Sequence, residues 1–415
     1  MYRYLILKKS LLPFSRSGDA SVLLPSRYNT LTAMPPEHPL PLSFSLSELA
    51  GSLGDFGTII PLILAVALVS DVDPRYILLF FGIWFILTGL YYRLPIPLEP
   101  MKAIAVVVIA AGAVGGISTG EIAAAGLMLG ILFLLLGYGQ VFSWIERWVP
   151  QSVVRGIQLG LALLLFRSSA GFIVQDPLFF GIGVAVILGF MLLVRYRGIP
   201  DLSSICVIAV GLAGGILLYG FPPLSLIHPP QILLPSLSDL VPAVTSLVLP
   251  QVVLTISNAI LATALLTKDL FGKEVPPKKF SLTIGLMNLT SVPFGGFPMC
   301  HGAGGLAGQY RYGARTGGAN VYAGLIFIVL ALFFTSPQVL SLIAVGVLGA
   351  LLLFVGIEMG RHSLKSDSLV LTLIIGVLAL VSSMTLAFIV GMILAYLIPA
   401  VRKRWSSAGT KKNEQ

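Results

Sequence analysis

Long apolar runs, separated by short polar connections, recur along almost the whole chain after residue 41. Each run approaches the roughly 20 residues that an α-helix needs to cross the hydrocarbon core of a bilayer. Only 10% of the 415 residues are charged, whereas an average soluble domain carries about 25%. A chain so poor in charge lacks the polar surface that water requires. The sequence therefore predicts an all-α polytopic membrane protein.

The apolar runs form two groups, and we expect fourteen transmembrane segments in all. The first group is expected near residues 44–69, 75–92, 98–115, 121–143, 152–174, 177–194 and 200–220. The second group is expected near residues 243–267, 279–295, 300–310, 317–335, 338–359, 367–382 and 384–401. The segments at 98–115 and 300–310 are short, and we expect two half-helices there.

This pattern divides the chain into five parts. We expect a disordered cytoplasmic tail (1–41), a first repeat (42–220), an extracellular loop (221–241), a second repeat (242–404) and a second cytoplasmic tail (405–415). A signal peptide is not expected, because no apolar core leads into a small-residue cleavage site. Met34 is an alternative start, which leaves open whether residues 1–33 belong to the mature protein.

Basic residues gather at alternate connections. With the N-terminus inside, the cytoplasmic connections hold Arg93, Arg147, Arg155, Arg195, Arg197, Lys268, Lys273, Lys278, Lys279, Arg311, Arg315, Arg361 and Lys365. The other side holds only Arg75 and Arg167. This asymmetry follows the positive-inside rule and predicts a protein of the cell membrane with both termini in the cytoplasm. It also accounts for the net charge of +9 without a nucleic-acid partner, which we do not expect.

An odd number of spans in each half gives the halves opposite orientations, as in an inverted repeat. The sequence carries a trace of such a repeat. Pro95-Ile-Pro-Leu-Glu-Pro-Met-Lys102 resembles Phe297-Pro-Met-Cys-His-Gly302, and each comes at the third span of its half. The fold prediction is therefore a 7+7 inverted repeat.

Proline and glycine interrupt both short segments, and we predict the binding site there. A helix that starts inside the membrane leaves unpaired backbone N–H groups at its N-terminus. Lipid cannot accept hydrogen bonds from these groups, so they must face protein or a hydrated cavity. Two such N-termini aimed at one point would concentrate positive potential and bind an anion. We expect the two helices to begin at Met101 and near Cys300.

The candidate binding residues come from both interruptions. They are Glu99, Pro100, Met101 and Lys102 in the first, and Cys300, His301, Gly302, Ala303 and Gly304 in the second. The glycines would let a ligand approach the backbone closely. The alternative is that they serve tight packing between helices.

Polar residues of the first and eighth spans complete the predicted site. Asp55 and Thr58 lie in a glycine-rich stretch of the first span, and the eighth span offers Gln251, Thr255 and Asn258. The last three are spaced i, i+4 and i+7, so that they share one helix face. They could form a neutral hydrogen-bonding wall for an oxyanion. The alternative is a polar contact between helices, worth about 1 kcal/mol.

Ionisable residues inside a membrane are costly and therefore point to function. Asp55, Glu99 and His301 are the candidates for proton coupling. Protonation of a carboxylate near an anion, or of a histidine, would favour entry of the anion. The alternative for the two carboxylates is a structural ion pair with Lys102.

Three motifs make the chain similar to a known family. They are Gly54-Asp-Phe-Gly-Thr58, Pro95-Ile-Pro-Leu-Glu-Pro-Met-Lys102 and Cys300-His-Gly-Ala-Gly-Gly-Leu-Ala-Gly-Gln-Tyr-Arg-Tyr-Gly-Ala-Arg315. On these residues the chain resembles the molybdate transporter family, distant relatives of the sulfate permeases. The resemblance implies import of molybdate, a tetrahedral dianion, by alternating access. It also implies core and gate domains, with the anion held between the third and tenth spans.

Two differences from these relatives bear on the substrate. Sulfate permeases usually carry a soluble C-terminal regulatory domain, and we expect none here. Plant members of the molybdate family often have glutamine where Glu99 stands. An added carboxylate would alter coupling or selectivity, so the choice of molybdate over sulfate stays open.

The first alternative function is a sulfate carrier of the same fold, followed by an anion channel and a nucleobase permease. A nucleobase carrier would place a carboxylate in the eighth span, where this chain has no acid before Asp269. We expect no enzyme, because no nucleophile–base pair or set of metal ligands is present. Cys206 and Cys300 stand far apart, so no disulfide framework, metal site or cofactor is expected. The expected partners are an oxyanion and the lipid bilayer, and a homodimer stays open.

Overall fold

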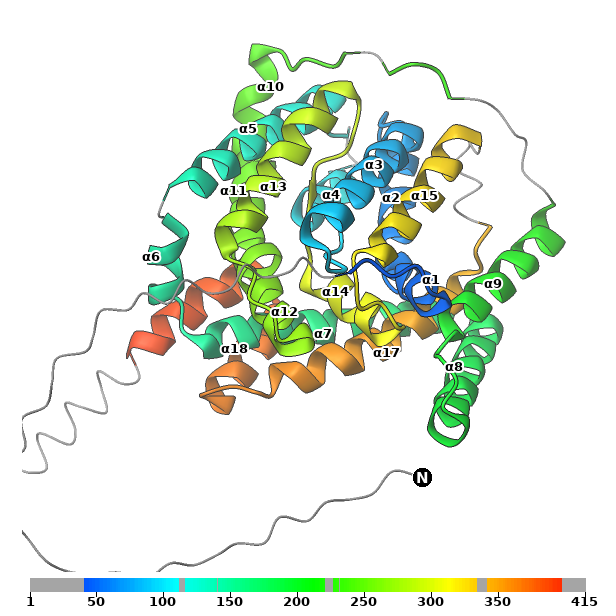
Figure 1. Cartoon of the computed structure of the whole chain (residues 1–415). Coiled ribbons are helices and arrows are strands. Elements are labelled where there is room, and N and C mark those ends of the chain that lie inside the picture. Colours follow the sequence, from blue (N-terminus) through cyan, green and yellow to red (C-terminus); the bar gives the residue numbers. More distant parts are fainter. Residues whose placement is uncertain are drawn as a thin grey trace, which may run out of the picture. The chain divides into compact units, whose positions relative to one another are not determined.

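The computed structural model describes residues 41–111, 116–139, 141–220, 227–230, 232–333 and 342–397. The predicted tails lie outside these ranges except for residue 41, and part of the predicted loop at 221–241 does too. The described chain is mostly helical (Figure 1). Seven of its helices are long and apolar enough to cross a membrane, and four shorter apolar helices accompany them.

The first half supplies seven spans. They are α1 (Leu46–Ser52) with α2 (Phe56–Val69), α3 (Pro74–Tyr92), β1 (Glu99–Pro100) with α4 (Lys102–Ala111), α5 (Thr119–Tyr138), α7 (Gln151–Gln175), α8 (Pro177–Arg197) and α9 (Ser203–Tyr219). The predicted span at 121–143 was too long, because α5 ends at Tyr138 and a separate short helix, α6 (Val141–Trp148), follows. Gly139 adopts an extended backbone conformation and ends the fourth span.

The second half supplies seven more. The eighth span is continuous from α10 (Leu237–Pro242) through η1 (Ala243–Val248), α11 (Leu249–Leu254) and η2 (Thr255–Ala262) to α12 (Thr263–Phe271). Next come α13 (Pro277–Ser291), the 3-10 turn η3 (Val292–Phe294), β2 (Met299–Cys300) with α14 (Ala303–Arg311), α15 (Gly318–Phe333), α17 (Val345–Ser363), α18 (Leu369–Val381) and the helix Met384–Leu397.

The eighth span begins earlier than predicted and is not a regular α-helix. α10 starts at Leu237, inside the stretch predicted as loop, because Ser236 and Asp239 form a capping box. The segments η1 and η2 are π-helical. Such wide turns are rare and often lie at functional sites. They also shift the positions of the side chains that follow them.

The packing of the spans shows the inverted repeat. The second span packs along the eleventh through α3 and α15, and the fourth packs along the ninth through α5 and α13. Exchanging each span with the one seven places away converts the first pair into the second. The third and tenth spans pair with each other through β1 and β2. The predicted 7+7 inverted repeat with two half-helices is confirmed.

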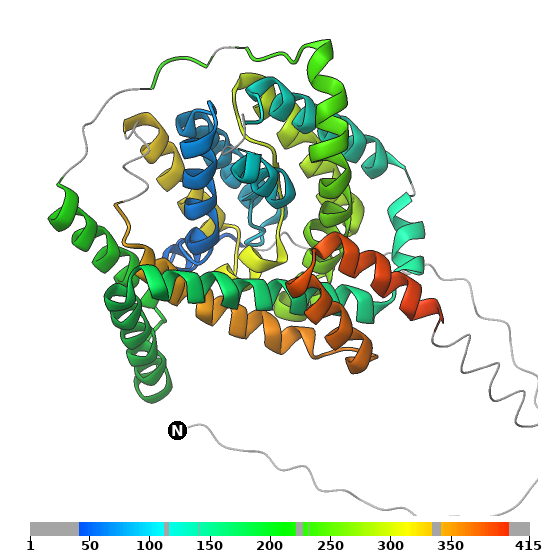
Figure 2. The same cartoon turned by 180° about the vertical axis from the view of Figure 1, so that it is seen from behind.

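The spans form two bundles. The core bundle holds spans one to four and eight to eleven. The gate bundle holds the other six, in which α7 packs along α17 and α18, and α8 packs against α17 and α9. Figure 2 shows α7 and α17 running side by side across the view, with α2 and the eighth span at an angle to them. The core bundle contacts the gate bundle through α1, α2, η2 and α14.

The two ends of the spans define two faces of the molecule. We call the loop face the one at which α9 ends and α10 begins. The basic face is the opposite one, where α8, α12 and α17 end in basic residues. These two names are used below for the two sides of the membrane.

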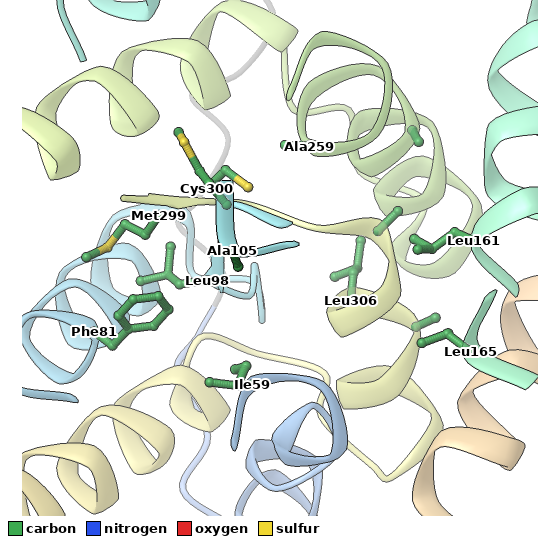
Figure 3. Packing of buried hydrophobic residues seen from close by; sticks show 14 of the residues in the cluster. Ile59, Phe81, Leu98, Ala105, Leu161, Leu165, Ala259, Met299, Cys300 and Leu306 are labelled. Carbon is green, nitrogen blue, oxygen red and sulfur yellow. The ribbon is translucent and has the colours of Figure 1, made fainter. Parts of the chain in front are cut away.

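Buried apolar side chains surround the point where the third and tenth spans meet (Figure 3). Leu98 and Met299 are fully buried beside the strands, and Leu306 is fully buried in α14. Leu161 and Leu165 of α7 belong to the same cluster and bring the gate bundle to this point. Polar groups at the crossing therefore lie in apolar surroundings, where electrostatic interactions are strong.

Candidate functional site: an anion site at the crossing of two half-helices

The two interrupted spans meet through a short antiparallel strand pair. β1 and β2 pair Glu99 with Cys300 and Pro100 with Met299. The N–H of Met101 donates a 2.9 Å hydrogen bond to the carbonyl of the residue before β2. The two interruptions therefore lie together, as the repeat predicted. Their helices α4 and α14 start slightly later than expected, at Lys102 and Ala303.

Two asparagine side chains form hydrogen bonds with the extended backbone next to the strands, where lipid could not supply donors or acceptors. Asn288 of α13 donates to the Met299 carbonyl at 2.7 Å and accepts from the Met299 N–H at 3.0 Å. Asn320 of α15 donates to the Ile96 carbonyl at 2.5 Å. Buried backbone groups without partners are costly in a membrane protein. These side chains make two helix breaks possible in the middle of the core bundle.

The N-terminus of α4 is capped from the eighth span. Gln251 Oε1 accepts hydrogen bonds from the N–H groups of Ala103 at 2.9 Å and Ile104 at 3.4 Å. Its Nε2 donates to Thr255 Oγ1 at 2.9 Å. Asn258 instead lines the cavity described below. Gln251 and Thr255 therefore share a helix face, as predicted. Asn258 lies within the π-helical segment η2 and faces the cavity instead.

The N-terminus of α14 is capped by a carboxylate from the third span. The N–H of Gly305 donates to Glu99 Oε1 at 2.8 Å. A Cβ added to Gly302 would lie only 2.6 Å from that oxygen. A Cβ added to Gly305 would lie 2.6 Å from Cγ of Asp55. Two glycines thus let two carboxylates approach the first turn of one helix, where its dipole favours negative charge.

Lys102 joins the two carboxylates into a cluster. Its Nζ lies 2.6 Å from Glu99 Oε2. Asp55 interacts electrostatically with both residues and lies beside Thr58. Glu99 is fully buried and Asp55 almost so. With all three groups ionised, the cluster of Asp55, Glu99 and Lys102 carries a net charge of −1.

A cavity of about 740 Å³ lies between the core and gate bundles and reaches this cluster. Its polar lining includes Thr58, Lys102 and Asn258. Among the described residues that line it, Lys102 alone is charged. The lining extends to Phe172 near the end of α7 and to Thr385 at the start of the last helix. The cavity therefore extends from the crossing toward the loop face.

His301 lies beside the cluster but does not line the cavity. Its Nδ1 lies 2.9 Å from the Pro97 carbonyl and its Nε2 lies 2.8 Å from Thr283 Oγ1. Because a carbonyl oxygen can only accept a hydrogen bond, we assign the ring proton to Nδ1. The unprotonated Nε2 then accepts a hydrogen bond from the Thr283 hydroxyl. The ring also packs edge-on against Tyr92. Both ring nitrogens are thus engaged in joining β2 to the third span and α13.

The predicted site residues divide into three groups by position. Thr58, Lys102 and Asn258 line the cavity. Asp55, Glu99, Gly302 and Gly304 form the layer behind Lys102, at the first turn of α14. Pro100, Met101, Gln251, Thr255, Cys300, His301 and Ala303 build the frame of buried backbone and hydrogen bonds.

Arg155 is a buried residue whose role the sequence did not reveal. It was predicted in a cytoplasmic connection, but it lies in α7 with a relative exposure of 1%. Its Nη1 forms a 2.5 Å ion pair with Asp269 of α12 and donates to Gln158 Oε1 at 3.0 Å. Gln158 in turn donates to the Ala262 carbonyl at 3.1 Å. A basic residue within an apolar run, several residues into the fifth span, was the available signal.

A second ion pair joins the two bundles near the basic face. Arg311 of α14 lies 2.9 Å from Asp201 in the connection between α8 and α9. Its guanidinium also packs over the ring of Phe354 in α17. Arg315, by contrast, packs over the ring of Tyr310 and donates to backbone carbonyls nearby. Arg311 thus connects core to gate, whereas Arg315 secures the end of its own segment.

Comparison with known proteins identifies the family. The family model described as the molybdate transporter of the MFS superfamily matches residues 47–165 and 243–359. The matched segments begin at the first and eighth spans, which correspond in the repeat. Molybdate transporter 2 of Arabidopsis thaliana is 32% identical over 405 residues, covering 85% of this chain and 87% of that protein. Molybdate transporter 1 of the same plant is 33% identical, covering 83% and 86%.

Solved structures share the fold at low sequence identity. The transmembrane domain of a cyanobacterium bicarbonate transporter, BicA, aligns with a TM-score of 0.54 and 16% identity, covering 84% of this chain and 96% of that chain. The murine Solute Carrier 26 family member A9 anion transporter aligns with a TM-score of 0.58 and 16% identity, covering 86% and 69%. The family match, the identities and the shared fold lead to one assignment. The chain belongs to the molybdate transporter family and is a multi-pass membrane protein for anion transport.

Proposed function

We propose that the protein is a secondary active transporter that imports a tetrahedral oxyanion by proton symport, with molybdate as the first candidate substrate. The observation that carries the proposal is the position of Lys102. This lysine lies at the N-terminus of α4 and is the charged group among the described residues that line the cavity. The names of the relatives, which are molybdate transporters, support the choice of substrate.

The groups around Lys102 suit an oxyanion. An ammonium group and a helix N-terminus both favour negative charge. The Thr58 hydroxyl and the Asn258 amide can donate hydrogen bonds to further oxygens of the anion. Apolar side chains such as Leu161, Leu165 and Val106 form most of the remaining wall. They lower the local dielectric constant and so strengthen the attraction of Lys102 for an anion.

Two cavities on opposite sides of one barrier support alternating access. The second cavity, also of about 740 Å³, lies at the basic face and is lined by Val154, Leu265 and Lys268. Between the two cavities, Gln158 of α7 is bonded to the Ala262 carbonyl of the eighth span. A relative movement of core and gate that opens this contact would connect the site to the basic face.

The orientation follows from the distribution of charge. We place the basic face in the cytoplasm, because positively charged connections remain there. The cavity that reaches Lys102 then opens to the outside of the cell. The ion pairs Arg155–Asp269 and Arg311–Asp201 hold the bundles together on the cytoplasmic side. In this orientation the described conformation is the one that receives the substrate.

The charge of the cluster supports proton coupling. Asp55, Glu99 and Lys102 together carry −1 when ionised, and a molybdate ion adds −2 beside them. Repulsion between like charges in an apolar site is strong. Protons taken up by the two carboxylates would remove it, and their release on the cytoplasmic side would help expel the anion. Asp55 and Glu99 are therefore the proposed proton carriers.

Equilibrium binding of labelled molybdate to the purified protein tests this function. We expect saturable binding that tungstate and sulfate compete for and that uracil does not. The variant Lys102→Met should weaken binding at least tenfold, which is about 1.4 kcal/mol. Lys268→Met is the matched control, since Lys268 is an exposed lysine at the other cavity.

Several outcomes would contradict the proposal. Equal molybdate affinity in Lys102→Met and the unmodified protein would mean that the binding site lies elsewhere. Competition by uracil would mean that the site binds a nucleobase. Stronger competition by sulfate than by molybdate would make sulfate the substrate. Uptake into proteoliposomes that rises without saturation would indicate a channel. A rate of molybdate uptake that is the same with and without an inward proton gradient would exclude proton symport.

A further inference from the structure

The carboxylate of Glu99 occupies the position that a bound oxyanion would be expected to take. One oxygen accepts the 2.8 Å hydrogen bond from the Gly305 N–H at the start of α14. The other lies 2.6 Å from Lys102 Nζ. A helix N-terminus and a cationic side chain are the two groups that usually hold oxyanions in proteins. The Glu99 carboxylate thus makes the contacts, to a helix N-terminus and to a lysine, that a bound oxyanion would make.

The surrounding structure is built around this carboxylate. Glu99 is fully buried, and its backbone is fixed by pairing with Cys300. Gly302 provides the space, because a side chain there would collide with the carboxylate. Because β1 holds the backbone, the side chain can move only over the length of its own bonds. The carboxylate is therefore tethered at the site whether or not substrate is present.

Lys102 is shared between this internal anion and the cavity. Its side chain has a relative exposure of 20%, compared with 1% for that of Glu99. It forms an ion pair with Glu99 on one side and lines the cavity on the other. An anion that arrives from the loop face meets Lys102 first. Because the negative charge of Glu99 offsets the positive charge of Lys102, the attraction between Lys102 and an incoming anion is weaker.

We propose that Glu99 competes with the transported anion for Lys102 and thereby sets the charge selectivity of the site. The proposal rests on the function proposed above and assigns one residue a specific role in it. The charged and titratable groups that face Glu99 are Lys102 on α4, Asp55 at the junction of α1 and α2, and Cys300 on β2. Ionised Glu99 repels a dianion about twice as strongly as a monoanion, because Coulomb energy scales with charge.

Binding of two tetrahedral oxyanions of different charge tests the proposal. Molybdate carries two negative charges and perrhenate carries one, with similar size and shape. The variant Glu99→Gln keeps the length of the side chain and an oxygen that can accept from Gly305, but removes the charge. We expect it to tighten molybdate binding at pH 7.5 at least tenfold. The gain in log affinity should be about twice that for perrhenate.

A charge-conserving variant at the same position is the control. Glu99→Asp keeps the negative charge on a shorter side chain. Its ratio of molybdate affinity to perrhenate affinity should therefore stay closer to that of the unmodified protein than the ratio in Glu99→Gln does. A ratio in Glu99→Asp that equals the ratio in Glu99→Gln would mean that the charge of Glu99 does not set the preference.

The outcomes separate this inference from the proposed function. If neither ion binds the unmodified protein, the proposed function fails. If both ions bind but Glu99→Gln changes their affinities equally, or weakens both, Glu99 is a structural cap and the inference fails alone. If Glu99→Gln does not fold, Glu99→Ala gives the same comparison, and an equal change in both affinities in that variant refutes the inference.

Discussion

Arg155 and Asp269 form an ion pair that joins α7 of the gate bundle to α12 of the core bundle, with 2.5 Å between Nη1 and Oδ2. The Arg155 side chain is almost completely buried, and that of Asp269 has a relative exposure of 16%. His362 of α17 lies 3.7 Å from the same carboxylate. Three spans from two bundles therefore meet at one acidic residue, on the side of the barrier opposite to the open cavity.

Arg155→Gln should loosen this closure. Removing one partner of a buried pair leaves the other charge uncompensated, which costs about 3–5 kcal/mol in full burial and less here because Asp269 is partly exposed. We expect faster labelling of a cysteine placed at Leu265, in the basic-face cavity, in a Cys206→Ser background. We also expect weaker binding of oxyanion from the loop face.

The control for this prediction is Lys268→Gln, which removes an exposed ion pair with Glu274 at the same cavity. It should change neither measurement, because exposed pairs contribute little. The charge exchange Arg155→Asp with Asp269→Arg should restore slow labelling in part. Labelling at Leu265 that is equally slow in Arg155→Gln would mean that the pair does not hold the two bundles together.

Gln251→Leu should destabilise the start of α4. The change leaves the N–H groups of Ala103 and Ile104 without their acceptor. Loss of a helix cap costs about 1–2 kcal/mol, so we expect a lower thermal unfolding temperature and weaker oxyanion binding. Thr245→Val is the matched control in the same span, because Thr245 is exposed and bonds only to carbonyls of its own turn. Equal unfolding temperatures of the two variants would refute the capping role.

Gly305→Ala should abolish binding, although alanine favours helices more than glycine does. The added methyl would overlap the Asp55 carboxylate and contact Pro97 at 2.9 Å. The carboxylate would have to leave the first turn of α14. Gly171→Ala and Gly189→Ala are the controls, because no heavy atom beyond the neighbouring residues and backbone of their own helix lies within 4 Å of the added methyl groups. These controls should bind molybdate normally, and normal binding by Gly305→Ala would count against the crowded arrangement.

Asp55→Asn should flatten the dependence of molybdate uptake on the proton gradient while the protein still folds. The amide keeps the shape of the side chain but removes one of the two carboxylates proposed to carry protons. Uptake into proteoliposomes at several external pH values measures the effect. Uptake that remained as steeply dependent on pH as before would exclude Asp55 as a proton carrier.

His301→Gln should leave that pH dependence unchanged. Both ring nitrogens of His301 already bond to Pro97 and Thr283 within the core bundle, and the ring does not line the cavity. We expect a lower unfolding temperature instead, because a buried hydrogen-bonded link is weakened. A flattened pH profile in this variant would restore His301 to the list of proton carriers.

Much of the fold could be predicted because membrane chains follow simple physical rules. Span length, the distribution of basic residues and the odd number of spans per half together predicted the inverted repeat. Proline and glycine marked the two half-helices, since these residues cannot continue a regular hydrogen-bonded helix. The strand pair was not predicted, although it meets the requirement that broken backbone in a membrane finds partners. The end of α5 at Tyr138 was missed because α6 continues the apolar pattern.

The site was predicted less completely because its decisive contacts join distant segments. The sequence indicated free N–H groups at the starts of α4 and α14, but it did not reveal that Gln251 and Glu99 cap them. Nor could the spacing of Gln251 and Asn258 reveal π-helical turns, which add a residue to each turn without a clear sequence signal. Arg155 was placed in a connection because basic residues usually mark membrane edges.

The strand pair between β1 and β2 has a consequence for how the chain matures. β1 leaves the ribosome early, whereas its partner belongs to the second half and is synthesised much later. In the meantime, unpaired peptide groups of the third span would cost several kcal/mol each in hydrocarbon. Until the tenth span enters the bilayer, the unpaired groups of the third span therefore need other hydrogen-bond partners, which the insertion machinery or water can supply. Neither half is a complete folding unit, although each contains seven spans.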